Sequence, residues 1–130
     1  MSERFHIEVA SRYEELWRYN IELTGQTADS GGSRLEYISA SSFVAPVGSK
    51  LAAVPEGYSP AGRDIGIDTE PAESLTLYIY VIPNTLPTER TVDLVKPFTL
   101  DVKISRGEEM LYDRHLSINQ FSGDNIEIKL

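Results

Sequence analysis

Residues 75–82, in the second half of this 130-residue chain, carry the pattern that most constrains its fold. Successive side chains of a β-strand point to opposite faces, so this stretch has two distinct sides. One side consists of Leu75, Leu77, Ile79 and Val81, and the other of Thr76, Tyr78, Tyr80 and Ile82. Because a strand that is apolar on both sides must be covered on both sides, the pattern predicts a central strand of a sheet.

The rest of the C-terminal half repeats this two-residue alternation, which is typical of β-strands. The repeats cover residues 98–105, 110–118 and 126–130. Residues 74–130 therefore predict four strands in succession, with a further short extended piece at 92–95. Pro83 ends the first of these strands. Arg106 and Gly107 predict a tight hairpin turn, in which the glycine supplies a positive φ.

The N-terminal part predicts three more strands, of which the second is ambiguous. Residues 5–9 alternate as a half-buried strand, and residues 34–39 form a shorter strand after a turn-rich loop at 25–33. Ser11 opens the spacing of a helix capping box, yet the apolar residues of 13–24 fall mainly on one face of a strand. We expect a long strand over 13–24, with a short helical turn near Ser11 as the alternative.

Residues 40–73 differ in character from the rest of the chain. These 34 residues contain four of the seven prolines and four of the nine glycines. Proline removes donors from a strand ladder, and a loop this long is usually functional or disordered. We expect a long Pro/Gly-rich loop at 40–73 that contains short edge strands around 42–44 and 64–67.

The pattern as a whole predicts an all-β chain with one domain at residues 1–130. About seven to eight strands separated by turns indicate an antiparallel β-sandwich. A small β-barrel is the alternative, because barrels have the same alternation.

Charge and cysteine content exclude several classes of function. The chain has 20 acidic and 12 basic residues and a formal net charge of −8, which disfavours binding to nucleic acid or to anionic lipid. The absence of cysteine excludes disulfides, thiolate zinc sites and a cysteine nucleophile. We find no signal peptide and no apolar stretch long enough to span a membrane, so we expect a cytoplasmic protein.

The sequence contains no recognisable catalytic constellation, so we expect neither enzymatic activity nor a cofactor. Residues 57–64 have the glycine spacing of a phosphate-binding loop but lack its Lys-Ser/Thr pair. His115 could pair with Asp113 on the same strand, yet no Gly-x-Ser-x-Gly motif supplies a nucleophile. His6 is the other histidine, and two histidines without cysteine make a weak zinc site.

Tyrosines on a strand surface indicate the most plausible binding site, since tyrosine is enriched at protein interfaces. We expect a non-enzymatic protein interaction or assembly module whose partner is a protein, either a second copy or a different chain. The expected binding residues are Tyr78, Tyr80, Tyr58 and Arg63. The alternative is a carbohydrate- or calcium-binding module that uses the 40–73 loop, with the calcium ligands Asp64, Asp68 and Glu70.

Overall fold

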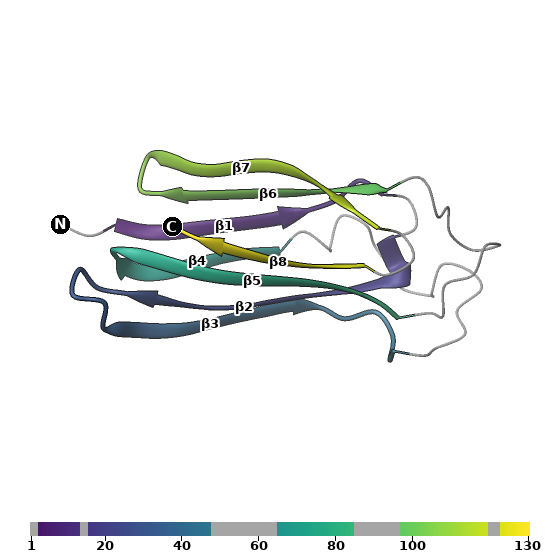
Figure 1. Ribbon diagram of the computed structural model, residues 1–130, viewed down its shortest axis with the longest axis horizontal. Coiled ribbons are helices and arrows are strands. Elements are labelled where there is room, and N and C mark those ends of the chain that lie inside the picture. Colours follow the sequence, from purple (N-terminus) through teal and green to yellow (C-terminus); the bar gives the residue numbers. More distant parts are fainter. Residues whose placement is uncertain (1–2, 14–15, 48–64, 85–96, 120–122) are drawn as a thin grey trace.

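Two four-stranded antiparallel sheets pack face to face in the computed structural model of the chain (Figure 1). The structure describes residues 3–13, 16–47, 65–84, 97–119 and 123–130. The strands are β1 (Glu3–Ala10), β2 (Tyr19–Ala28), β3 (Arg34–Ser42), β4 (Ile65–Ala72), β5 (Ser74–Pro83), β6 (Phe98–Arg106), β7 (Glu109–Ile118) and β8 (Asp124–Lys129). Sheet A has the order β4-β1-β6-β7 and sheet B the order β3-β2-β5-β8, which confirms the β-sandwich rather than the barrel.

One apolar core lies between the two sheets and follows the alternation of the sequence. The inward residues of β5 and β6 are at most 5% exposed. These residues are Leu75, Leu77, Ile79, Val81, Phe98, Leu100, Val102 and Ile104. Burial of each such side chain stabilises the fold by roughly 1.5–3 kcal/mol relative to its exposure to water. Each sheet therefore turns its remaining residues outward, and these outer faces are available for function.

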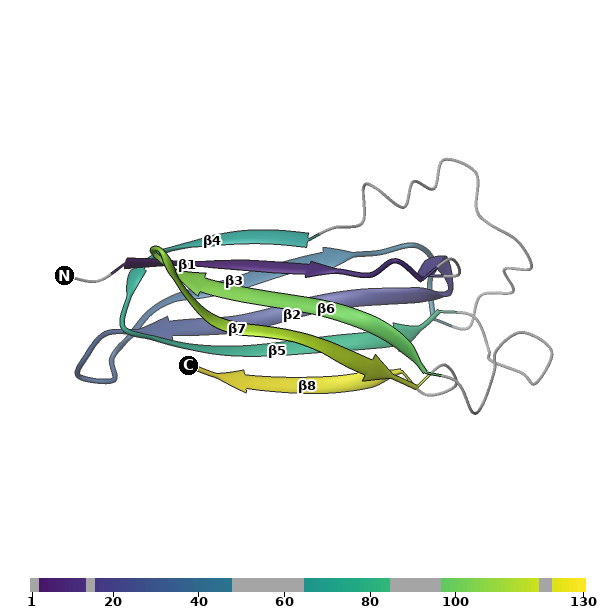
Figure 2. The same cartoon turned by 90° about the horizontal axis from the view of Figure 1, so that it is seen from above.

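Strand β5 is a central strand, as its two-sided pattern predicts. It pairs with β2 on one side and with β8 on the other (Figure 2). Tyr78 lies opposite Thr24 and Glu127 in this register, and Tyr80 lies opposite Glu22. The prediction of a strand that begins at residue 13 is wrong, because a 3₁₀ turn at Leu16–Arg18 precedes β2. Because three successive residues of this turn are buried, their burial does not alternate as it would on the two faces of a strand.

Two expected loops are shorter than the sequence predicts. The turn after β2 spans only residues 29–33, because β2 continues to Ala28. The loop expected at 40–73 is shorter at both ends, because β3 continues to Ser42 and β4 occupies Ile65–Ala72. The edge strand expected around 64–67 is confirmed as the first part of β4, whereas no separate strand forms at the described residues 42–44. Strand β4 tolerates Pro71 because it is an edge strand, where a missing backbone donor need not disrupt the sheet. The extended piece expected at 92–95 lies outside the described residues.

A buried asparagine fixes the described beginning of the loop that follows β3. Asn20 Nδ2 donates to the Ala45 carbonyl at 2.7 Å, and Asn20 Oδ1 accepts from the Val44 amide at 2.8 Å. Asn84 Nδ2 also donates to Asn20 Oδ1 at 3.3 Å. The chain after β3 therefore folds back over the outer side of β2 at this end of sheet B.

A hydrogen bond also joins the adjacent edges of the two sheets. The backbone amide of Glu70 in β4 donates to Glu36 Oε1 in β3 at 2.7 Å. This contact links sheet A to sheet B at the surface, outside the apolar core.

Candidate functional site

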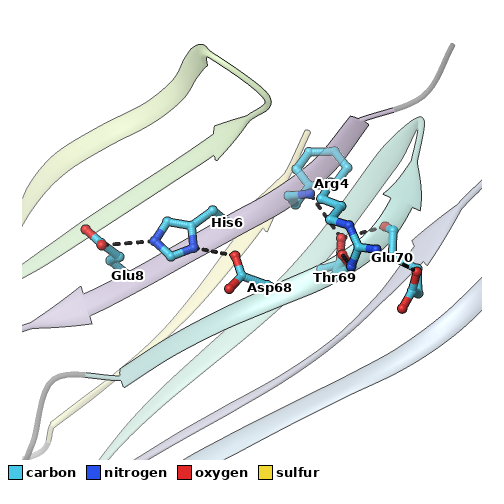
Figure 3. Close-up of polar contacts among 7 residues, drawn as sticks. Arg4, His6, Glu8, Asp68, Thr69 and Glu70 are labelled. Carbon is cyan, nitrogen blue, oxygen red and sulfur yellow. Dashed lines mark hydrogen bonds and ion pairs between the residues drawn. The ribbon is translucent and has the colours of Figure 1, made fainter.

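The outer face of sheet A is polar and its side chains bind one another. Figure 3 shows one group at the β1–β4 pair, where His6 lies between two carboxylates. His6 Nδ1 is 2.6 Å from Asp68 Oδ1, and His6 Nε2 is 2.9 Å from Glu8 Oε1. The hydrogen bonds to Glu8 and then to Asp68 raise the pKa of His6 above its usual value of 6.5. Both ring nitrogens are therefore occupied within this group.

A β-bulge lies beside His6, and the next acidic residue of β4, Glu70, forms an ion pair with β1 there. The register between β1 and β4 shifts between Arg4 and His6. The Phe5 amide donates to Thr69 Oγ1 at 3.0 Å, and Arg4 Nη2 lies 3.4 Å from Glu70 Oε2 (Figure 3). The bulge therefore turns β4 so that Glu70 faces a cation on the neighbouring strand.

Two of the expected calcium ligands lie in a strand rather than in a loop. Asp68 and Glu70 belong to β4, and each has one carboxylate oxygen within hydrogen-bond or ion-pair distance of a β1 side chain. Asp64 lies outside the described residues. No group of three or more His, Asp or Glu side chains among the residues placed by the structure could hold a metal ion. Calcium binding at this position stays a prediction.

A second carboxylate–histidine pair lies on the same face, between β6 and β7. His115 Nδ1 is 2.5 Å from Asp101 Oδ1, because the register places these two residues opposite each other. The partner expected from the sequence was Asp113, which instead lies opposite Lys103. The Ser11 hydroxyl, near this pair, donates to the Thr99 carbonyl at 2.6 Å. The hydroxyl proton of Ser11 is therefore held by a backbone carbonyl.

The outer face of sheet B is aromatic near its centre. Tyr78 and Tyr80 both project from this face of β5 and are half-buried, as the alternation predicts. Exposed acids flank them, because Glu22 lies beside Tyr80 on β2 and Glu127 lies beside Tyr78 on β8. Lys129 Nζ pairs with Glu127 Oε1 at 3.1 Å, and this contact raises the pKa of the lysine.

Large apolar side chains extend this aromatic face along β3 and just beyond it. Leu35 is 48% exposed, Tyr37 is 70% exposed and Phe43 is 68% exposed. The Arg34 guanidinium stacks on the Tyr37 ring at 4.3 Å from its centroid. Sequence reasoning missed these residues, although the alternation of 35, 37 and 39 against Ile38 contained the signal.

The structure thus brings together only part of the expected binding site. Tyr78 and Tyr80 share one face, but Tyr58 and Arg63 lie outside the described residues. Residues 48–64 also lie outside the described residues, so a covering of the two tyrosines by this segment is not tested. Asp68 and Glu70 lie on sheet A, whose outer face points away from sheet B.

Comparison with models of protein families, with curated proteins and with solved structures finds no match to this chain. Over the residues that the structure describes, no helix is long and apolar enough to cross a membrane.

Proposed function

We propose that this chain is a non-enzymatic protein-interaction module that uses the outer face of sheet B. The observation that carries the proposal is the pair Tyr78 and Tyr80, which lies on a central strand between exposed acids of both neighbouring strands. The partner is a second protein that presents arginine or lysine side chains to this face.

The chemistry of the two tyrosines supports such a partner. A half-buried tyrosine has few rotatable bonds left to order, so it offers contact area at low entropic cost. Its ring also attracts cations, and an arginine over a tyrosine contributes about 0.5–1 kcal/mol at an exposed site. Glu22 can pair with the same cation, because it lies opposite Tyr80 and is exposed.

Charge disfavours a second copy of the chain as the occupant. Two copies that met through this face would bring Glu22 and Glu127 of both molecules into one interface. The formal net charge of −8 adds a longer-range repulsion. A basic partner removes both costs and gains steering during association.

Quantitative affinity capture from the native host tests the proposal. We expect Tyr80→Ala to reduce capture of a specific basic protein at least tenfold, because tyrosine truncation at an interface centre commonly costs more than about 1.4 kcal/mol. Tyr112→Ala is the control, since Tyr112 is also a half-buried strand tyrosine but packs against the core from β7 of sheet A. Circular dichroism of both variants verifies that they stay folded.

Two results would overturn the proposal. One is a captured protein that binds Tyr80→Ala as well as it binds the original chain. The other is self-association in light scattering that Tyr80→Ala abolishes, since the face would then bind a second copy.

A further inference from the structure

The outer face of sheet A contains a hollow of about 910 Å³ at the end of the sheet opposite the β6–β7 turn. Its floor includes the register row Ala10, Asp101 and His115, which crosses β1, β6 and β7. Alanine leaves room at the centre of the sheet because its side chain is a single methyl group. The hollow is separate from the tyrosine face of sheet B.

The segment that follows β1 forms one wall of this hollow, and several contacts fix it. The Ser11 hydroxyl donates to the Thr99 carbonyl at 2.6 Å and accepts from the Tyr13 amide at 3.2 Å. The Tyr13 ring stacks on Phe98 with 4.7 Å between centroids and 9° between planes. The wall therefore presents an aromatic side chain that the core holds in place.

The charged groups of the hollow differ in how far they are already satisfied. Each acid already contacts a histidine. Glu8 Oε1 lies 2.9 Å from His6 Nε2, and Asp101 Oδ1 lies 2.5 Å from His115 Nδ1. The cations Arg12 and Lys103 line the same hollow and are exposed. Neither cation forms an ion pair with any residue in the described part of the chain.

We propose that this hollow binds an acidic saccharide, a sugar that carries a carboxylate group. The carboxylate pairs with Arg12 and Lys103, the two lining cations that form no ion pair with any described residue. The sugar hydroxyls donate to the remaining lone pairs of Glu8 and Asp101. The apolar side of the sugar ring packs against Tyr13.

Simpler ligands fit the hollow less well. A small inorganic anion would pair with the two cations but would offer no hydroxyl donors to offset repulsion by Glu8 and Asp101. A neutral sugar would gain the hydroxyl contacts but would leave both cations unpaired. A ligand that combines one anionic group with several hydroxyl donors satisfies both sets of side chains.

Isothermal titration calorimetry with matched methyl glycosides tests the inference on the full chain. The probes are methyl glucuronide, methyl galacturonide and a methyl sialoside, with methyl glucoside and acetate as controls. We expect at least one acidic glycoside to bind at least tenfold more tightly than methyl glucoside and than acetate. The binding should weaken as salt is added, because part of it is an exposed ion pair.

Charge variants locate the binding. Lys103→Gln and Arg12→Gln should each lower the affinity about tenfold, as expected for the loss of a charge-assisted hydrogen bond. Lys129→Gln is the matched control, since it removes the same charge from the exposed face of sheet B. No binding of any acidic glycoside, equal binding of methyl glucoside or acetate, or an equal loss in all three variants would overturn the inference.

Discussion

The two outer faces of this sandwich rest on the same core yet differ in how their side chains are satisfied. On sheet A, histidines lie within hydrogen-bond distance of carboxylates on the same or a neighbouring strand, as at His6 with Asp68 and at His115 with Asp101. On sheet B, half-buried Tyr78 and Tyr80 and exposed Tyr37 place aromatic rings among polar residues of the outer face. The difference shows that one alternating pattern can produce a polar, internally bonded face and an aromatic face on opposite sides of one core.

This contrast separates two kinds of candidate site. On the polar face, the cations of the hollow that form no ion pair with a described residue are Arg12 and Lys103, and these are open to an anionic ligand. On the aromatic face, the ring surfaces themselves are the binding groups, and internal pairing matters little. A ligand of sheet A is therefore defined by charge, and a partner of sheet B by shape and by its cations.

The largest expected loss of stability comes from substitutions in the core, which should be common to both sheets. Leu77 of β5 and Leu100 of β6 are both fully buried in the common core. We expect Leu77→Ala and Leu100→Ala each to lower the free energy of unfolding by about 2–5 kcal/mol, through lost burial and the cavity left behind. Urea denaturation of each variant measures this. A loss below about 1 kcal/mol in either variant would contradict a shared core.

A smaller loss of stability should distinguish the hydrogen bonds that hold a loop segment on each of the two sheets. Asn20 is buried and holds residues 44–45 on sheet B, whereas Ser11 is only partly buried and holds the wall of the hollow on sheet A. We expect Asn20→Ala to cost about 1–3 kcal/mol of unfolding free energy, because it leaves buried polar groups without partners. Ser11→Ala should cost about 1 kcal/mol or less, since water can replace a partly exposed bond.

The same denaturation experiment checks this second comparison. A cost for Ser11→Ala that equals or exceeds that of Asn20→Ala would show that burial does not set the difference.

The smallest effect concerns the polar face alone and depends on pH. The hydrogen bonds to Glu8 and Asp68 raise the pKa of His6, so the folded state holds this proton more tightly than the unfolded state. His6 therefore stabilises the fold below the unfolded pKa of about 6.5, and this stabilisation is lost as pH rises through the higher folded pKa. Because the side chain is 44% exposed, solvent screening keeps the gain below about 1 kcal/mol.

Comparison of His6→Gln with the original chain measures this gain. The difference in unfolding free energy should be larger at about pH 5.5 than at about pH 8.5. In a Glu8→Gln background the pH-dependent part should shrink, because Glu8 is the larger cause of the shift. A pH-independent difference would show that the carboxylates do not bind the protonated ring.

Alternation predicted most of the sheet structure, because burial of one face imposes it directly on the sequence. It identified the class of fold and the central position of β5. It failed at Leu16–Arg18, where consecutive residues are buried on a turn. At β4 it predicted an edge strand only around 64–67, whereas the strand continues through Pro71 to Ala72 because proline is tolerated at an edge. Both failures occur where tertiary position outweighs local pattern.

The candidate sites were less predictable because they depend on pairing across strands. Alternation placed Tyr78 and Tyr80 on one face, yet it could not pair His115 with Asp101. A plain hairpin that begins with Arg106 opposite Glu109 would place Asp101 opposite Arg114. The bulge between Ile104 and Ser105 shifts the register by one residue and brings His115 there instead.

The hydrogen bond between Glu36 and the Glu70 amide has a consequence for behaviour at high concentration. An exposed edge strand is a template for aggregation, because its free backbone donors can pair with a strand of another molecule. On β4, the Glu70 amide is already bound by Glu36, and the next residue, Pro71, has no amide proton. The Glu70 amide therefore offers no free donor to an incoming strand, and the proline beside it has no donor on either side of the strand. Both features disfavour polymerisation of the protein through β4.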